Sequence, residues 1–229
     1  MKLLAIDTSS LACSVALTVD GTVLERHEEK AREHTRLLMP MVHEVLADGG
    51  LAPEQLDAIV LGNGPGSFIG MRIAASVAQG LAHGVGLKIV PVSSMAAVAA
   101  QVFEETEATE VVVAQDAHMN EVYLGAFRRG PGNEPEEVFP ERLQTQTLIE
   151  ELTPDLAPSR VAAGFGWERY PGLAEANETV IGQPSHLQHP RARYLLILGE
   201  AALGRGAALN PQDLVPAYLR SKVAEKPSG

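Results

Sequence analysis

Apolar and polar residues along the first 30 positions predict three consecutive β-strands. The strand-like runs are 2–7, 12–18 and 21–28, and Asp20-Gly21 separates the second run from the third. An Asp-Gly pair between two such runs is a strong hairpin signal. The chain is therefore expected to begin with three strands, the last two joined as a hairpin.

The pattern then changes to alternating helices and strands. A first helix is predicted from apolar residues at helical spacing, namely Leu37, Leu38, Met41, Val42, Val45 and Leu46. A buried strand at 58–61, a helix at 68–83 and a strand at 88–92 follow, and Ser93 or Ser94 caps a third helix. A strand, a helix and a strand at this spacing form a βαβ unit, which requires a parallel pair and a right-handed crossover.

After Glu104 the composition becomes more acidic, and new strands are predicted. The runs 111–115 and 121–127 resemble a hairpin, and 161–164 resembles a further parallel strand. The stretch 129–140 is rich in Pro, Gly and Glu, which predicts a solvated loop with a short strand near Val138. With a last helix at 191–204, we expect two lobes that comprise residues 1–104 and 105–229.

Composition and charge exclude several classes of function. Hydrophobic residues make up 45% of the 229 residues, which is typical of a globular protein. The 18 basic and 29 acidic residues give a net charge of -11, which disfavours an independent nucleic-acid binder. A single cysteine, Cys13, excludes an internal disulfide and a multi-cysteine zinc site. No apolar run reaches the ~20 residues of a membrane span, so we expect a cytoplasmic protein without membrane contact.

Two segments are candidates for ligand chemistry. The glycine-rich stretch 62–70 lies between a predicted strand and a predicted helix, where backbone N–H groups are available to an anion. It lacks the GxxxxGK[ST] spacing of a P-loop. Asp7 and the hydroxyl residues after it follow the first strand, where they could contact phosphates or a metal-bound water. Both segments also fit a purely structural interpretation, as tight turns that pack the chain against itself.

Catalytic and metal-binding constellations are not evident in the sequence. None of the seven histidines forms an HxxxH pair on one helix face. Ser67 follows a glycine but lacks the G-x-S-x-G spacing of a nucleophile elbow. A peptidase or esterase is therefore disfavoured.

The stretch 58–103 contains no Asp or Glu, and Arg72 and Lys88 are its only full charges. Its first helix carries two apolar stripes, one of branched residues (Ile73, Val77, Leu81) and one of small residues (Met71, Ala75, Ala78, Ala82). A helix that is apolar nearly all round is buried all round. Since a sheet covers one side only, either the other helix of this lobe or another protein covers the rest.

Several motifs resemble the bacterial TsaB (YeaZ) family. They are MKLLAIDTSS at the N-terminus, GNGPGSFIGMRIAAS at 62–76, VPVSSM at 90–95, DAHMNEVY at 116–123 and PAYLR at 216–220. The resemblance covers essentially the whole chain. Ile69 and His118 depart from the family pattern, which more often has Thr and Arg at these positions.

The resemblance implies an α/β fold of the actin-like, sugar-kinase-like ATPase (ASKHA) class. That fold has two lobes of βββαβαβα type, and the second lobe is degenerate in this family. The family also resembles TsaD, which transfers a threonylcarbamoyl group to the adenosine next to the anticodon of tRNAs that read A-starting codons. By this resemblance the chain is a catalytically silent paralogue and not an enzyme itself.

The resemblance further implies a heterodimer with TsaD through the helices of the N-terminal lobe, completed by the ATPase TsaE. A homodimer would use the same surface, and tRNA would be met only through the complex. The predicted interface residues are Leu38, Met39, Met71, Ala75, Ala78 and Ala82. No cofactor is expected for this chain alone, and whether a nucleotide sits at the TsaD interface stays open.

The alternative function is that of a small-molecule kinase or ATPase with its substrate in the cleft between the lobes. Asp7 and the glycine-rich stretch 62–70 would then contact the phosphates. Against it, the Asp-x-Gly-Thr phosphate loop of such enzymes reads Asp-Thr-Ser-Ser here, without the glycine that admits a phosphate.

Overall fold

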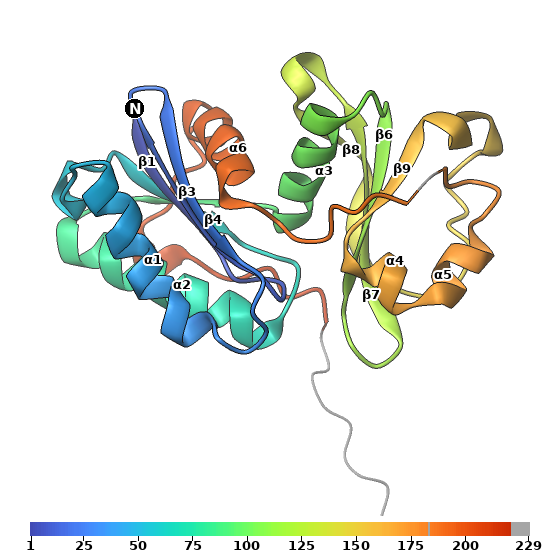
Figure 1. Cartoon of the computed structure of the whole chain (residues 1–229), viewed down its shortest axis with the longest axis horizontal. Helices are drawn as coiled ribbons and strands as arrows, with labels where there is room; N and C mark the ends of the chain where they lie inside the picture. Colours follow the sequence, from blue (N-terminus) through green and yellow to red (C-terminus); the bar gives the residue numbers. More distant parts are fainter. Residues whose placement is uncertain (183, 221–229) are drawn as a thin grey trace, which may run out of the picture.

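Two mixed β-sheets, each with helices packed on its faces, form the two lobes of the chain (Figure 1). This computed structural model describes residues 1–182 and 184–220. Within them, no helix is both long enough and apolar enough to cross a membrane.

The first lobe follows the predicted order of elements. Its elements are β1 (Lys2–Asp7), β2 (Cys13–Val19), β3 (Thr22–Glu28), α1 (His34–Asp48), the short 3-10 helix η1 (Pro53–Gln55), β4 (Ala58–Gly62), α2 (Phe68–Val85), β5 (Ile89–Val92) and α3 (Ser94–Glu105). The sheet order is β3-β2-β1-β4-β5, with β1 antiparallel to β2 and parallel to β4. The predicted hairpin, which joins β2 and β3, and the predicted parallel pair, which is β4 and β5, are confirmed.

The second sheet repeats part of the first. It contains β6 (Glu110–Asp116), β7 (Glu121–Arg129), β8 (Pro135–Thr145) and β9 (Arg160–Ala163) in the order β8-β7-β6-β9. This order and the strand directions match β3-β2-β1-β4. The remaining elements are η2 (Pro131–Asn133), η3 (Pro154–Ser159), α4 (Phe165–Arg169), α5 (Pro171–Ala176), α6 (Ala192–Gly204) and η4 (Pro211–Asp213).

The predicted short strand near Val138 is present as part of β8, but the loop predicted around it over 129–140 is too long. The turn is confined to η2, and β8 then runs for 11 residues as the edge strand of the second sheet. Its prolines and glutamates argue against a central strand, but an edge strand tolerates both because one side of its backbone needs no partner.

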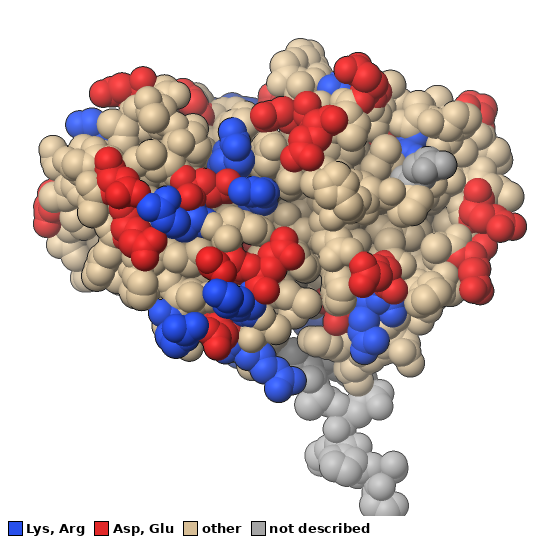
Figure 2. Space-filling model, viewed as in Figure 1, with Lys and Arg blue, Asp and Glu red and all other residues tan. Residues whose placement is uncertain are grey.

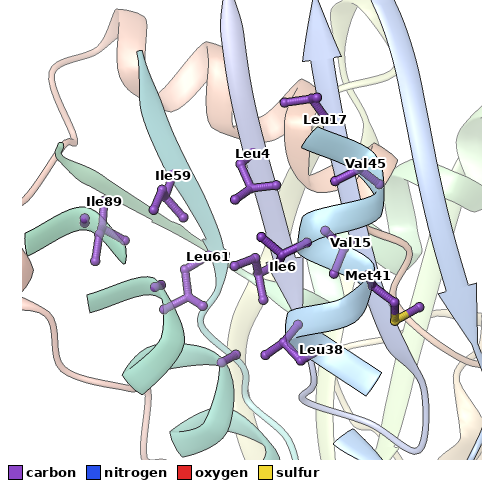
Figure 3. Close-up of a cluster of buried hydrophobic side chains, with 14 of the residues drawn as sticks. Leu4, Ile6, Val15, Leu17, Leu38, Met41, Val45, Ile59, Leu61 and Ile89 are labelled. Carbon is purple, nitrogen blue, oxygen red and sulfur yellow. The ribbon is translucent and has the colours of Figure 1, made fainter. Parts of the chain in front are cut away.

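The helices α1 and α2 cover one face of the first sheet. Leu38, Met41 and Val45 of α1 point towards strand residues such as Ile6 and Val15, as Figure 3 shows. All five side chains are buried. On this side of the lobe, the exposed surface is therefore formed by the outer sides of α1 and α2.

The opposite face of the first sheet is covered by α6, which comes after all strands of the second sheet in sequence (Figure 1). Beyond α6, Leu209 pairs with Ile89, and Leu214 joins the core beneath α1 and α2. The predicted division at residue 104 is therefore wrong for the C-terminal part, because 192–214 packs on the first lobe. Conversely, α3 packs on the second sheet with one face and on α6 with another. Residues 221–229 of the predicted second lobe lie outside the described residues.

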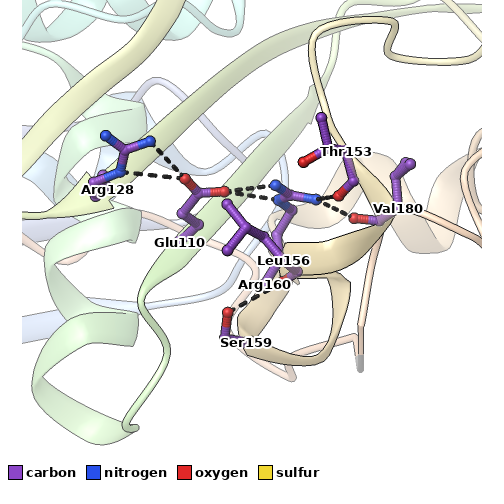
Figure 4. Close-up of polar contacts among 7 residues, drawn as sticks. All are labelled: Glu110, Arg128, Thr153, Leu156, Ser159, Arg160 and Val180. Atoms are coloured by element: carbon purple, nitrogen blue, oxygen red, sulfur yellow. Dashed lines mark hydrogen bonds and ion pairs between the residues drawn. The ribbon is translucent and has the colours of Figure 1, made fainter.

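A buried ion pair anchors β9 to β6 within the second lobe. The guanidinium of Arg160, which is only 2% exposed, donates hydrogen bonds of 3.0 and 2.7 Å to Glu110 Oε2. It also donates to the carbonyl groups of Thr153 and Val180 (Figure 4). Arg128 reaches the other carboxylate oxygen of Glu110 from the protein surface.

Candidate functional site

Asp7, at the end of β1, is enclosed by the chain. It is 1% exposed, and both carboxylate oxygens accept hydrogen bonds. Oδ1 accepts from the backbone N–H and the hydroxyl of Ser9, each at 2.8 Å, and Oδ2 accepts from Ser94 Oγ at 2.6 Å. Burial raises the pKa of Asp7 to about 6, although the hydrogen bonds from Ser94 and Ser9 favour its charged form.

The glycine-rich stretch 62–70 packs against the segment that follows β1. A Cβ atom at Gly62 would overlap the Asp7 carboxylate, and one at Gly70 would overlap the carbonyl oxygen of Thr8. Thr8 Oγ1 in turn donates a 2.7 Å hydrogen bond to the Gly70 carbonyl. The close approach that requires these glycines is therefore between two parts of this chain, as in the structural interpretation of the sequence.

A cavity of about 700 Å³ lies between the two lobes. Residues from the first lobe, among them Ser9, Ser10 and Ile69, face Asp116 and Phe165 of the second. Asp116 ends β6 as Asp7 ends β1, and its Oδ1 accepts hydrogen bonds of 2.7 Å from Tyr170 and from the backbone of His118. Asp116 thus borders the cavity, whereas Asp7 is not among the residues that line it.

Metal ligands do not gather in the described part of the chain. Within residues 1–182 and 184–220, no group of three or more His, Cys, Asp or Glu side chains is arranged to hold a metal ion. The one cysteine, Cys13, is buried, and burial raises the pKa of its thiol to about 12.

An exposed, mainly apolar groove runs between α1 and α2 on the outer side of the first lobe. It encloses about 390 Å³. We call it the α1–α2 groove, and its lining residues are Thr35, Leu38, Met39, Ile69, Arg72, Ile73, Ser76 and Val77. Ile69 is 70% exposed, which is the largest exposure among the apolar side chains identified as exposed in the described residues. A largely exposed isoleucine beside other apolar side chains is typical of a contact surface.

The first turn of α2 holds Ile69 in this position. Ser67 caps the helix, because its hydroxyl accepts a hydrogen bond from the Gly70 N–H at 3.2 Å. Gly70 itself lies against Thr8, so that turn is fixed to the end of β1. Ile69, one residue before, consequently projects away from the sheet.

Four of the predicted interface residues are not on the surface. Met71, Ala75, Ala78 and Ala82 are at most 4% exposed, and the three alanines belong to the core between α2 and the first sheet. The small side chains let α2 lie close to the strands. The predicted interface is therefore wrong for this stripe, because its close approach is to the sheet.

The two predicted interface residues of α1 differ in position. Leu38 is 1% exposed and forms the floor of the α1–α2 groove, so its main contact is with the core. Met39 is half-buried on the wall of the groove. For Met39 the interface role stays a prediction.

Sequence reasoning missed most of the residues that line the groove. Ile73 and Val77 form the stripe of branched side chains that the sequence already contains, and they are only half-buried. The signal that identifies them is side-chain size. Small residues suit the closely packed side of a helix, so the bulkier stripe is the one left outside.

Arg72 lies at the edge of the groove and is held by two aromatic rings. Its guanidinium carbon lies 3.5 Å from the centre of the Phe68 ring, and Nε donates a 3.0 Å hydrogen bond to the hydroxyl of Tyr218. The rings of Phe68 and Tyr218 are 5.7 Å apart. The C-terminal segment thus contributes to the surface next to the groove.

Comparison with known proteins gives a consistent result. The family model of TsaD, tRNA N6-adenosine threonylcarbamoyltransferase, matches residues 26–228. The chain is similar to a protein from Haemophilus influenzae named tRNA threonylcarbamoyladenosine biosynthesis protein TsaB, with 37% identity over 99% of this chain and 96% of that protein. The protein of the same name from Escherichia coli is 36% identical over 99% of this chain and 97% of its own length.

Two solved structures from Pseudomonas aeruginosa have the same fold over nearly the whole chain. One, described as YeaZ, has a TM-score of 0.84 and 34% identity, and covers 95% of this chain and 99% of its own. The other, described as an uncharacterized protein with similarity to peptidase YEAZ, has a TM-score of 0.87 and 35% identity, and covers 96% and 99%.

Proposed function

The chain belongs to the TsaB (YeaZ) family, and from this premise we propose that it is a non-catalytic subunit in tRNA threonylcarbamoyladenosine biosynthesis. In this proposal it acts in the cytoplasm as the partner of a TsaD-family protein. That partner transfers the threonylcarbamoyl group to the adenosine next to the anticodon.

The observation that carries the proposal is the α1–α2 groove. An apolar surface on the outside of a helix pair stabilises a protein when a second helix pair covers it. Ile69, Ile73 and Val77 offer such a surface, and Met39 borders it. The partner's helices would lie here, on the lobe that the family resemblance assigns to dimerisation.

The enclosed carboxylate of Asp7 supports a non-catalytic role. Both of its oxygens accept hydrogen bonds within the chain, and the glycine-rich stretch 62–70 packs directly against the segment that follows β1. This arrangement also argues against the kinase or ATPase alternative. The strand order and its repeat in the second lobe fit a degenerate actin-like, sugar-kinase-like fold.

Charge supports a role in which tRNA is met through the complex. The net charge is -11. On the face shown in Figure 2, Lys and Arg side chains are interspersed with Asp and Glu side chains and do not gather in one stripe. A polyanion binds at physiological salt only where positive charges are concentrated.

We further propose that TsaE is the third component of the complex, and that the isolated chain forms a homodimer through the same groove.

The decisive experiment compares two isoleucines on the first lobe. Ile69→Glu places a carboxylate in the α1–α2 groove, and Ile197→Glu places one on α6, where Ile197 is 53% exposed. Both chains should fold, since both side chains are solvated. We expect Ile69→Glu to lose the complex with TsaD in light scattering and Ile197→Glu to keep it.

The same proteins then enter a modification assay that omits TsaD, TsaE or this chain in turn. We expect threonylcarbamoyl transfer to require all three and to fail with Ile69→Glu. Transfer by this chain alone would overturn the non-catalytic assignment, and intact binding by Ile69→Glu would overturn the assignment of the groove. A calorimetric titration with ATP tests the kinase alternative, and we expect no binding to the isolated chain.

A further inference from the structure

The α1–α2 groove contains one charged side chain among the described residues that line it, Arg72. The whole stretch 58–103 has no Asp or Glu. The acidic residues of α1 and its N-terminus are also engaged elsewhere. Glu33 pairs with Arg36, and Glu44 and Asp48 both pair with Arg26. The groove therefore offers a cation without a carboxylate beside it.

The guanidinium of Arg72 is oriented in advance. Phe68 supports one of its faces, and the Tyr218 hydroxyl accepts the hydrogen bond from Nε. Within residues 1–182 and 184–220, neither Nη atom makes a hydrogen bond or an ion pair with the chain. A guanidinium fixed in this way keeps its two Nη groups available for a planar acceptor such as a carboxylate.

Covering the groove with an apolar surface removes water from Arg72. A cation that loses water without gaining an acceptor weakens the association, whereas one that meets a carboxylate contributes to it. A second copy of this chain, docked groove on groove, brings a second Arg72 and none of the carboxylates it needs. A different partner can supply one.

We propose that Arg72 selects the partner, favouring an apolar helix face that carries one Asp or Glu opposite the guanidinium over a second copy of this chain. This inference rests on the proposed function, because it concerns the same groove. It assigns the chemistry of the partner's surface, and it predicts that the heterodimer is tighter than the homodimer although both dimers use one site.

The test replaces Arg72 by Met, which keeps an unbranched apolar stem and removes the charge. The full-length chain is titrated with TsaD by calorimetry, and its self-association is measured by analytical ultracentrifugation. We expect Arg72→Met to bind TsaD about tenfold or more weakly, while its homodimer is as tight as that of the unchanged chain or tighter. Arg193→Met is the control, since Arg193 is also exposed but lies on α6, outside the groove, and we expect it to change neither affinity.

Salt dependence provides a second readout. Binding of TsaD to the unchanged chain should weaken with salt more steeply than binding to Arg72→Met. Arg72→Lys keeps the charge but not the planar fork, and we expect it to bind TsaD with an intermediate affinity. That variant also replaces Arg72→Met if circular dichroism shows that the latter does not fold.

The outcomes separate this inference from the proposed function. If Ile69→Glu abolishes TsaD binding but Arg72→Met binds as tightly as the unchanged chain, the selection by Arg72 is overturned and the proposed function stands. If Arg72→Met weakens the homodimer and the heterodimer equally, the selection is also overturned, because Arg72 then stabilises both dimers alike and does not discriminate between the partners. If the unchanged chain does not bind TsaD at all, the proposed function itself is overturned.

Discussion

The hydroxyl of Ser94 donates a 2.6 Å hydrogen bond to the carboxylate of Asp7. This contact joins the last residue of β1 to the first residue of α3, the helix that packs on the second sheet. The same hydroxyl accepts a hydrogen bond from the Gly64 N–H at 3.1 Å, so the glycine-rich stretch is part of the connection. Asp7 therefore serves as an anchor between elements, with its charge enclosed.

Stability should depend on pH through Asp7. Burial raises its pKa from 3.8 to about 6, so the folded state holds the proton more tightly than the unfolded state. The contribution to stability is complete below pH 4 and is lost as the pH rises through 6. We expect the free energy of unfolding to fall by about 3 kcal/mol over this range, relative to a chain in which this group does not titrate.

The reference chain is Asp7→Asn, which has nearly the same shape. Urea unfolding of both proteins is measured between pH 4 and 7.5. The difference between their free energies of unfolding reports on Asp7, because the contributions of the other titrating groups cancel. Among these is Glu141, since burial raises its pKa to about 7. A difference that stays constant with pH would contradict the raised pKa of Asp7.

Substitution of Gly62 by Ala should destabilise the fold. The new Cβ atom would overlap the Asp7 carboxylate and lie 3.0 Å from Ser94 Oγ, so strand β4 or the anchor must move. Overpacking of this kind costs about 1–3 kcal/mol. Gly80→Ala in α2 is the control, because a Cβ there meets nothing within 4 Å. In a helix interior it should stabilise by about 0.5 kcal/mol. Equal midpoints of urea unfolding for the two variants would show that the approach of Gly62 to Asp7 is not tight.

Much of the fold was predictable because its signals are local. Short apolar runs and an Asp-Gly pair predict the hairpin of β2 and β3. Short apolar runs and a serine cap predict the strands and helices from β4 to α3. The position of α6 was not predictable in this way. An apolar helix face shows that a helix packs on something, but not which of two sheets it packs on.

The candidate site was predictable only in part. The sequence shows that α2 has two apolar stripes, and it leaves open which of them faces the sheet. The sheet takes the alanine stripe around Ala78, since small side chains allow close packing, and this leaves Ile73 and Val77 on the outside. Arg72 could not be assigned a role from sequence, because Tyr218, which orients it, is 146 positions away.

The ion pair of Glu110 and Arg160 offers a test of the second lobe. Glu110→Ala leaves the buried guanidinium of Arg160 without its carboxylate, and we expect a loss of about 3–5 kcal/mol in urea unfolding. Arg128→Ala should cost under about 1 kcal/mol, since the Arg128 side chain is 58% exposed. The pair Glu110→Leu and Arg160→Met, made together, should recover part of the stability, because no charge is then left unpaired although the carbonyl groups of Thr153 and Val180 lose their donor. A double variant as unstable as Glu110→Ala would contradict the assignment of the loss to an unpaired charge.

The position of the alanine stripe of α2 is tested by a charge at Ala78. This residue is fully buried between α2 and the first sheet, so Ala78→Glu places a carboxylate in an apolar core without a partner. The cost should be about 3 kcal/mol or more, a large part of the stability of a domain of this size. Ser76→Glu, two residues earlier on the exposed side, should change stability by about 0.5 kcal/mol or less. Circular dichroism and urea unfolding of the two isolated variants measure this difference in stability.

If Ala78→Glu folds as well as Ser76→Glu, then Ala78 is accessible and the alanine stripe is again a candidate interface. If it unfolds while Ser76→Glu stays folded, only the branched stripe is left to meet a partner.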